Sequence, residues 1–127
     1  MRFIEKKLKD NDINDLIISH GNILTALYES DGQLTMSQIA KKIGKDKSTV
    51  TPLIDKLLKI GYIEKIKNEE DKRVTYIILT EKGKKLEPKF DSITEAVHET
   101  AYKNFTQEEK EIFLKLLKKL NTNFTQE

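Results

Sequence analysis

The residues best suited to chemistry are the hydroxyl and ammonium groups of DKSTVTPLIDK, residues 46–56. Apolar side chains at i, i+3, i+4, i+7 and i+8 indicate a buried helix face made of Val50, Leu53, Ile54, Leu57 and Leu58. The polar side chains therefore fall on the opposite face. Ser and Thr can bond base edges, Lys can neutralise phosphate, and a small apolar ring can meet a thymine methyl group. A solvated helix face without any ligand is the plainer interpretation.

Pro52 lies where this helix should already be established. A proline inside a helix removes one backbone hydrogen bond and costs about 3 kcal/mol. The N-cap can be Asp46 or Ser48, which makes Pro52 the sixth or the fourth helical residue. In both cases the carbonyl that loses its partner is that of Ser48, on the outward face, where water can reach it. We expect Pro52 to mark the unpacked side of the helix.

Positive charge is concentrated in the same part of the chain. The formal net charge of the whole chain is +2, but residues 41–67 hold eight lysines against three acidic residues. A local excess of this kind favours a polyanion as partner. Charge alone is equally compatible with a solvated lysine-rich surface.

A second polar run, NEEDKR at residues 68–73, separates two stretches rich in β-branched and aromatic residues. This pattern predicts a β-hairpin with a polar tip. Lys72 and Arg73 suit phosphate, and arginine suits a narrow minor groove, whereas Glu69 and Glu70 do not. Asp71 could pair with Arg73 or cap the turn. An ordinary charged hairpin remains the alternative.

Catalysis finds little support in the sequence. The chain has no cysteine, which excludes thiolate nucleophiles, disulfides and Cys-based zinc sites. His20 and His98 are far apart, and no Gly-rich phosphate loop or metal-ligand spacing is present. We therefore expect no enzyme activity, no cofactor and no metal, and we interpret His20 as a packed or interface histidine.

The length of 127 residues fits one domain, and the 37% hydrophobic content is enough for one modest core. No apolar run reaches the roughly 18 residues that a membrane span needs, and the N-terminal residues lack the apolar centre of a signal peptide. We expect a cytoplasmic protein without a membrane partner.

Periodicity and turn residues predict helices at residues 2–9, 15–29, 36–43, 46–60, from Thr80 to about Asn104, and after Thr106, with strands at 34–35, 62–67 and 74–79. Thr35 or Ser37 should cap the third of these helices, and Pro88 should kink the fifth. Two helices joined by a short turn and followed by a hairpin make a winged helix-turn-helix of mainly α (α+β) class.

The segments LTMSQIAKKIGKDKSTVTPLIDKLLKIGYIEK, EEDKRVTYIILTEKG and FTQEEKEIFLKLLKKL, in this order, resemble the MarR family of winged-helix transcriptional regulators. The resemblance implies a dimeric repressor of a pseudo-palindromic operator, with a small-molecule effector as a further partner. It also implies one MarR-like domain over residues 1–127, in which helices of residues 1–30 and 81–124 dimerise and residues 31–80 bind double-stranded DNA. The STVTP run is similar to a peroxide-sensing subset, but the reactive cysteine of that subset is missing.

The resemblance and the helix pattern together assign three sets of site residues. Residues 46–60 would enter the major groove and the wing at residues 63–79 the minor groove. The expected DNA contacts are Lys45, Lys47, Ser48, Thr49, Thr51, Pro52, Lys56, Lys72 and Arg73, with Asp71 structuring the wing. The expected homodimer interface consists of Phe3, Ile4, Leu8, Ile112, Phe113, Leu116, Leu117 and Leu120. The alternative is a winged-helix adaptor that binds another protein and no DNA.

Overall fold

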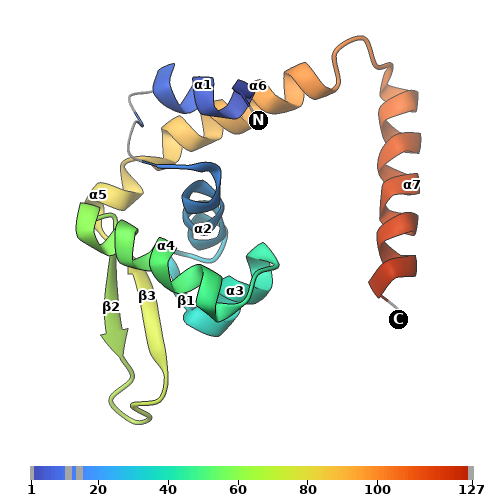
Figure 1. Ribbon diagram of the computed structural model, residues 1–127. Coiled ribbons are helices and arrows are strands. Elements are labelled where there is room, and N and C mark those ends of the chain that lie inside the picture. The colour runs from blue at the N-terminus through green and yellow to red at the C-terminus, as the bar shows by residue number, and fades with distance from the viewer. Residues whose placement is uncertain (1, 11–12, 14–15, 126–127) are drawn as a thin grey trace. The chain divides into compact units, whose positions relative to one another are not determined.

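The computed structural model describes residues 2–10, 13 and 16–125. Its elements in chain order are α1 (Arg2–Asp10), α2 (Ile18–Tyr28), β1 (Gln33–Thr35), α3 (Met36–Ile43), α4 (Lys47–Ile60), β2 (Ile63–Lys67), β3 (Thr75–Leu79), α5 (Glu81–Lys84), α6 (Glu87–Ala101) and α7 (Gln107–Thr125). This order confirms the mainly α winged helix-turn-helix (Figure 1). Within the described ranges, no helix is long and apolar enough to cross a membrane.

The chain divides into two compact units, Met1–Ile93 and Thr94–Glu127, and the boundary falls inside α6. In the first unit, α2 packs on α3 and α4, these two helices contact a small sheet, and the hairpin β2–β3 projects away from the helices (Figure 1). The second unit holds the end of α6 and the whole of α7.

The three strands form an antiparallel sheet in the order β1-β3-β2. Ile63 pairs with Leu79 and Lys67 with Thr75, so the wing hairpin spans all five residues of each strand. The short strand β1 pairs with the other edge of β3, from Gln33 opposite Ile78 to Thr35 opposite Tyr76. Because β1 runs directly into α3, the sheet ties the base of the wing to the start of the helix-turn-helix.

The core of the first unit comes from α2, α3, α4 and the sheet. Its most deeply buried side chains are Ile23, Leu24, Leu27, Ile39, Val50, Ile54, Leu57, Ile63 and Ile77. On α4, Val50, Ile54 and Leu57 are fully buried, whereas Leu53 and Leu58 flank them and are half-buried. The predicted apolar face is therefore the face that packs.

Local capping chemistry fixes the two helices of the helix-turn-helix. Thr35 accepts a hydrogen bond from the Gln38 amide, and the Gln38 side chain accepts one from the Thr35 amide, which makes a capping box for α3. Gly44 ends α3 in the left-handed region, with φ 69°, and Gly61 ends α4 there as well, with φ 93°. The N-cap of α4 is Asp46, so Pro52 is the sixth helical residue.

Two helix predictions need correction. The helix predicted from residue 15 begins only at Ile18, and residue 15 itself lies outside the described residues. The reason is an unusual cap, because the His20 Nδ1 accepts a hydrogen bond from the Ile17 amide at 3.0 Å and so fixes the first turn there.

The helix predicted from Thr80 onward is not one kinked helix. It is divided into α5 and α6 by a turn at Lys85 and Leu86, and Pro88 is the second residue of α6. A proline in a first helical turn needs no amide hydrogen, because the amides of that turn have no partner within the helix. The chain therefore avoids the kink by starting a new helix.

Candidate nucleic-acid interface

The first turn of α4 is organised by the carboxylate of Asp46. Its Oδ1 accepts hydrogen bonds from the Ser48 hydroxyl at 2.7 Å and the Thr49 amide at 2.8 Å. These bonds, from the Ser48 side chain first and then from Thr49, lower the pKa of Asp46, and the nearby Lys45 ammonium adds to the effect. Asp46 is therefore ionised at neutral pH, and it holds Ser48 and Thr49 in one fixed arrangement at the start of the helix.

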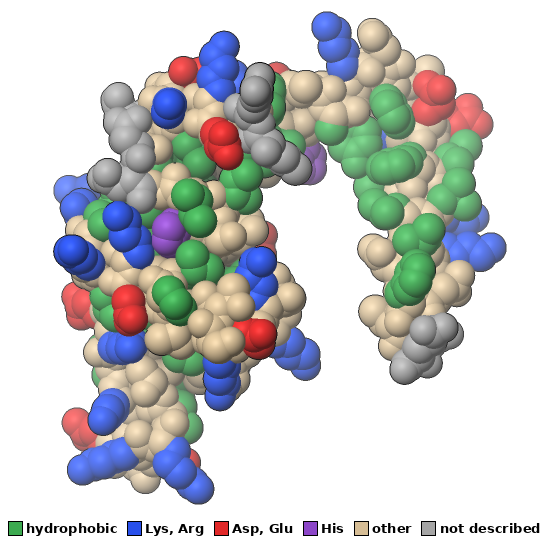
Figure 2. Space-filling model, in the orientation of Figure 1, with side chains coloured by type: hydrophobic (Ala, Val, Ile, Leu, Met, Phe, Trp, Pro, Cys, Tyr) green, Lys and Arg blue, Asp and Glu red, His purple; other side chains and the backbone are tan. Residues whose placement is uncertain are grey.

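The outward face of α4 carries the side chains that the sequence assigned to DNA. Lys47, Ser48, Thr49, Thr51, Pro52 and Lys56 are all exposed. The Thr51 hydroxyl donates a hydrogen bond to the Lys47 carbonyl at 2.8 Å. In Figure 2, Lys and Arg side chains lie over the face of the winged lobe that α4 occupies and again at the tip of the wing.

Contacts from α5 fix the C-terminal end of α4. The Thr80 hydroxyl donates to the Gly61 carbonyl at 2.6 Å, and the Lys82 Nζ donates to the Ile60 carbonyl at 2.8 Å. A lysine at this position also complements the partial negative charge of the helix end. Gly83 lies so close to the Tyr62 carbonyl that an added Cβ would collide with it. We call the contacts of Thr80, Lys82 and Gly83 with residues 60–62 the α4–α5 clamp.

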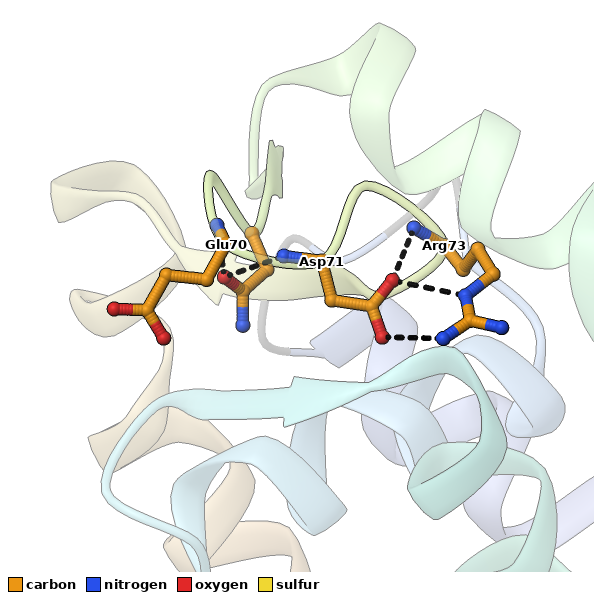
Figure 3. A network of polar contacts seen from close by, with 4 residues as sticks. Glu70, Asp71 and Arg73 are labelled. Atoms are coloured by element: carbon orange, nitrogen blue, oxygen red, sulfur yellow. Dashed lines mark hydrogen bonds and ion pairs between the residues drawn. The ribbon is translucent and has the colours of Figure 1, made fainter.

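The wing tip is built around Asn68 and Asp71 (Figure 3). The Asn68 side-chain oxygen accepts hydrogen bonds from the Glu70 and Asp71 amides. Asp71 accepts from the Arg73 amide at 3.1 Å and from the Arg73 guanidinium at 3.0 and 3.2 Å. Asp71 thus makes both contacts that the sequence left open, the ion pair and the turn cap.

The Asp71–Arg73 pair fixes the direction of the guanidinium without burying it. The Arg73 side chain is 90% exposed. The hydrogen bonds from Arg73 lower the pKa of Asp71, so this carboxylate is ionised at neutral pH. An exposed pair of this kind contributes little to stability, so its value lies in presenting an oriented cation at the tip of the wing.

One hollow, of about 350 Å³, joins the wing to the helix-turn-helix. Lys47 and Thr51 of α4 and Arg73 of the wing line it, together with Thr35, Met36, Ser37, Val74 and Thr75. Three residues assigned to DNA from the sequence thus meet at one concave surface. Lys45, Lys56 and Lys72 are exposed but do not line this hollow.

Sequence reasoning missed the contribution of α3 to this surface. Met36 and Ser37, in the first turn of α3, line the hollow although no local pattern marks them as a site. The pairing of Thr35 with Tyr76 is what brings the start of α3 beside the wing. The only local signal was the capping role of Thr35, which places the first turn of α3.

His20 is a buried residue in the first turn of α2. It is 7% exposed, and burial first and the Lys56 ammonium second lower its pKa. Because its Nδ1 accepts from the Ile17 amide, the neutral ring carries its proton on Nε2. The interpretation of His20 as a packed histidine agrees with this burial. Among the described residues, no three His, Cys, Asp or Glu side chains are grouped as metal ligands.

The second unit exposes an apolar stripe along α7. Ile112, Phe113, Leu116, Leu117 and Leu120 are between 42% and 57% exposed, and hydrophobic side chains cover this helix in Figure 2. Beside the turn before α7, Tyr102 and Phe105 stack edge-on with centroids 5.5 Å apart, and Phe113 lies 6.2 Å from Phe105. In the first unit, Phe3 is exposed and Ile4 half-buried, whereas Leu8 is buried within the chain.

These elements define the class of the protein as a winged helix-turn-helix, in which the second helix exposes a polar face and the wing ends in a charged tip. The model of the MarR family matches residues 18–75. The HTH-type transcriptional regulator YybA of Bacillus subtilis (strain 168) is 33% identical over 114 residues, which cover 88% of this chain and 75% of that protein. The chain belongs to the MarR family, and it is a DNA-binding transcriptional regulator.

Two further relatives support this assignment. The HTH-type transcriptional repressor YetL of Bacillus subtilis (strain 168) is 37% identical over 100 residues, which cover 75% of this chain and 58% of YetL. The crystal structure of a MarR transcriptional regulator from Methanosarcina mazei Go1 matches with a TM-score of 0.82 and 28% identity, over 98% of this chain and 88% of that one. The likeness thus extends well beyond residues 18–75.

Proposed function

We propose that this chain acts in the cytoplasm as a homodimeric repressor of a pseudo-palindromic operator. Each α4 enters a major groove, and the two half-site centres lie about 10 bp apart. Residues 31–80 form the DNA-binding lobe, and helices of residues 1–30 and 81–124 form the dimerisation region of one MarR-like domain. The description of YetL as a repressor supports the direction of regulation.

The observation that carries the proposal is the shared surface of α4 and the wing. Lys47 and Thr51 come from α4, Arg73 comes from the wing tip, and all three line one hollow. A cationic group on each side of a polar hollow suits a phosphate backbone that passes between a major and a minor groove. Lys45, Lys56 and Lys72, which are exposed nearby in the sequence, add phosphate contacts around it.

The dimer part of the proposal rests on the α7 stripe. Five large apolar side chains in one row, each at least 42% exposed, are too many to leave in water on a single helix. A second copy of the same helix offers a matching row, which is the usual solution in a two-fold symmetric dimer. Phe3 and Ile4 would extend this interface, whereas Leu8, which the sequence also assigned to it, is already buried within the chain.

A salt series with a selected operator tests the proposal. DNA that the full-length protein retains from a random pool should bind with log affinity falling steeply as log salt rises, because lysines release counterions from phosphates. Lys47→Ala should reduce this slope by about one, whereas the matched control Lys118→Ala, on α7, should leave it unchanged. Absent or salt-independent retention would favour the protein-binding adaptor instead.

A further inference from the structure

Two hydroxyl groups exposed on α4, those of Ser48 and Thr51, have their hydrogens committed to the protein. The Ser48 hydroxyl bonds to the Asp46 carboxylate at 2.7 Å, and the Thr51 hydroxyl bonds to the Lys47 carbonyl at 2.8 Å. An ionised carboxylate and a backbone carbonyl can only accept hydrogen bonds. The direction of both bonds is therefore fixed by chemistry, and both hydroxyls act as donors toward the protein.

The consequence is that this face offers acceptors to a ligand. Each hydroxyl oxygen keeps lone pairs after its hydrogen is used, and both side chains are exposed. Pro52 leaves a further acceptor, because it has no amide hydrogen to donate to the Ser48 carbonyl four residues earlier. The neutral groups that Ser48, Thr51 and Pro52 leave available for recognition are therefore oxygens.

We propose that the N-terminal half of α4 reads exocyclic amino groups in the major groove, namely N6 of adenine and N4 of cytosine. This inference rests on the proposed function and specifies its chemistry. In the major groove these amino groups are the hydrogen-bond donors, whereas N7 and O6 of guanine, N7 of adenine and O4 of thymine are acceptors. Acceptors on Ser48 and Thr51 complement the donors, and the Pro52 ring suits the methyl group of a neighbouring thymine.

Division of labour between charged and neutral groups supports this assignment. The cations beside these hydroxyls, Lys47 on α4 and Arg73 on the wing, line the hollow with Thr51 and suit phosphate. Reading N7 or O6 with the hydroxyls would require them to release the 2.7 and 2.8 Å bonds. Of these two bonds, the bond from Ser48 is the harder to break, because its acceptor is an ionised carboxylate.

Base analogues distinguish the two kinds of contact. Once an operator has been selected, each adenine can be replaced by purine and each cytosine by 2-pyrimidinone, which removes the amino group, or each purine by its 7-deaza form, which removes N7. We expect amino-group removal at positions under α4 to weaken wild-type binding about three- to tenfold. We expect 7-deaza substitution of the purine in each of these base pairs to change affinity less than about twofold.

Variants at Thr51 connect the effect to this helix. Thr51→Val keeps the shape of the side chain but removes its oxygen. At one base position, the variant should therefore bind the unmodified operator and the amino-free operator with equal affinity. The matched control Thr51→Ser keeps an oxygen and should still discriminate. A wild-type loss on 7-deaza DNA without a loss on amino-free DNA would overturn the inference, and so would Thr51→Val that still discriminates at every position.

The variant Pro52→Ala provides a second, independent test of the inference. Alanine restores the amide hydrogen, which then bonds the Ser48 carbonyl within the helix and withdraws that oxygen from recognition. We expect the variant to keep its fold and to lose part of the amino-group discrimination; unchanged discrimination at every position would contradict the role of Pro52. Failure of the proposed function is seen separately, as absence of salt-dependent binding to the unmodified operator.

Discussion

The winged lobe and the last helix of the same chain treat their apolar side chains in opposite ways. In the lobe, Ile54 and Leu57 of α4 are fully buried against the other helices and the sheet. On α7, Leu116 and Leu117 occur in a similar helical pattern, yet about half of each side chain is exposed. The same periodicity therefore leads to a core in one unit and to an uncovered surface in the other.

This difference teaches that a hydrophobic stripe predicts a packing partner but does not say which chain supplies it. The lobe supplies partners for α4 from nearby in the chain, because α2, α3 and strand β2 of the hairpin pack against it. Among the described residues of its own unit, α7 is accompanied by the end of α6 and one turn. We therefore expect the first unit to unfold as an independent core, and α7 to depend on association.

The largest effect should come from placing a charge on the α7 stripe. Leu117→Glu should raise the dimer dissociation constant by about three orders of magnitude, because a carboxylate loses its hydration in an apolar interface. Light scattering at micromolar concentration should then show monomers, while the lobe stays folded. Lys118→Glu, on the opposite side of α7, should remain dimeric. A persistent Leu117→Glu dimer would mean that the chains associate elsewhere.

A cavity in the lobe should have the next largest effect. Ile54→Ala should lower the free energy of unfolding by about 2–5 kcal/mol, because Ile54 is fully buried and its removal leaves a void. Ile66→Ala is the control on the wing, where the isoleucine is 46% exposed, and it should cost under about 1 kcal/mol. Urea unfolding measures both, and equal losses would refute the contrast between buried and exposed positions.

Substitutions at the wing tip should lower operator affinity without lowering the stability of the fold. Arg73→Ala should lower operator affinity by about 1–3 kcal/mol, or roughly 5- to 150-fold, with a nearly unchanged melting temperature, because this side chain is exposed. Asp71→Asn should have a smaller effect, since it weakens the orientation of Arg73 but leaves the cation in place. Unaltered affinity of Arg73→Ala across the salt series would count against a wing contact with DNA.

The smallest effect should come from His20. Its pKa is lowered from the ordinary value of 6.5, so the unfolded chain binds the proton more readily than the folded chain. The stability due to the neutral ring is therefore complete above pH 6.5, and it is lost as the pH falls from 6.5 toward the folded pKa, by at most about 1.4 kcal/mol per pH unit. Urea unfolding at pH 7.5 and 5.5 should show this loss, and His20→Gln should reduce it. His98→Gln, at an exposed position, is the control.

Most of the fold could be predicted because its signals are local. Thr35, one of the two caps predicted for α3, does cap that helix, and the capping boxes of Thr35 with Gln38 and of Thr106 with Glu109 each form within four residues. The predicted start of α2 was wrong because a histidine, which sequence rules do not count among caps, fixes the first turn of this helix. The division between α5 and α6 was missed because Pro88 is compatible with either a kink or a new first turn.

The candidate site, like the fold, could be predicted only where its signals are local. The exposure of Ser48, Thr51 and Pro52 follows from the helix period, which sets them opposite the buried face. The contribution of Met36 and Ser37 to the hollow depends on the pairing of β1 with β3, which joins residues more than 40 positions apart. No local pattern carries such information, so this part of the surface required the structure.

The α4–α5 clamp sets a fixed spacing between α4 and the wing of one chain. Since Thr80 and Lys82 bond the end of α4 directly, both ends of the wing hairpin are tied to the helix that we propose reads the bases. One extra base pair within a half-site displaces the next groove by about 3.4 Å and turns it by about 36°. A fixed spacing between α4 and the wing cannot follow this displacement. Operators of this protein should therefore vary in base sequence but keep a constant distance between the two grooves of each half-site.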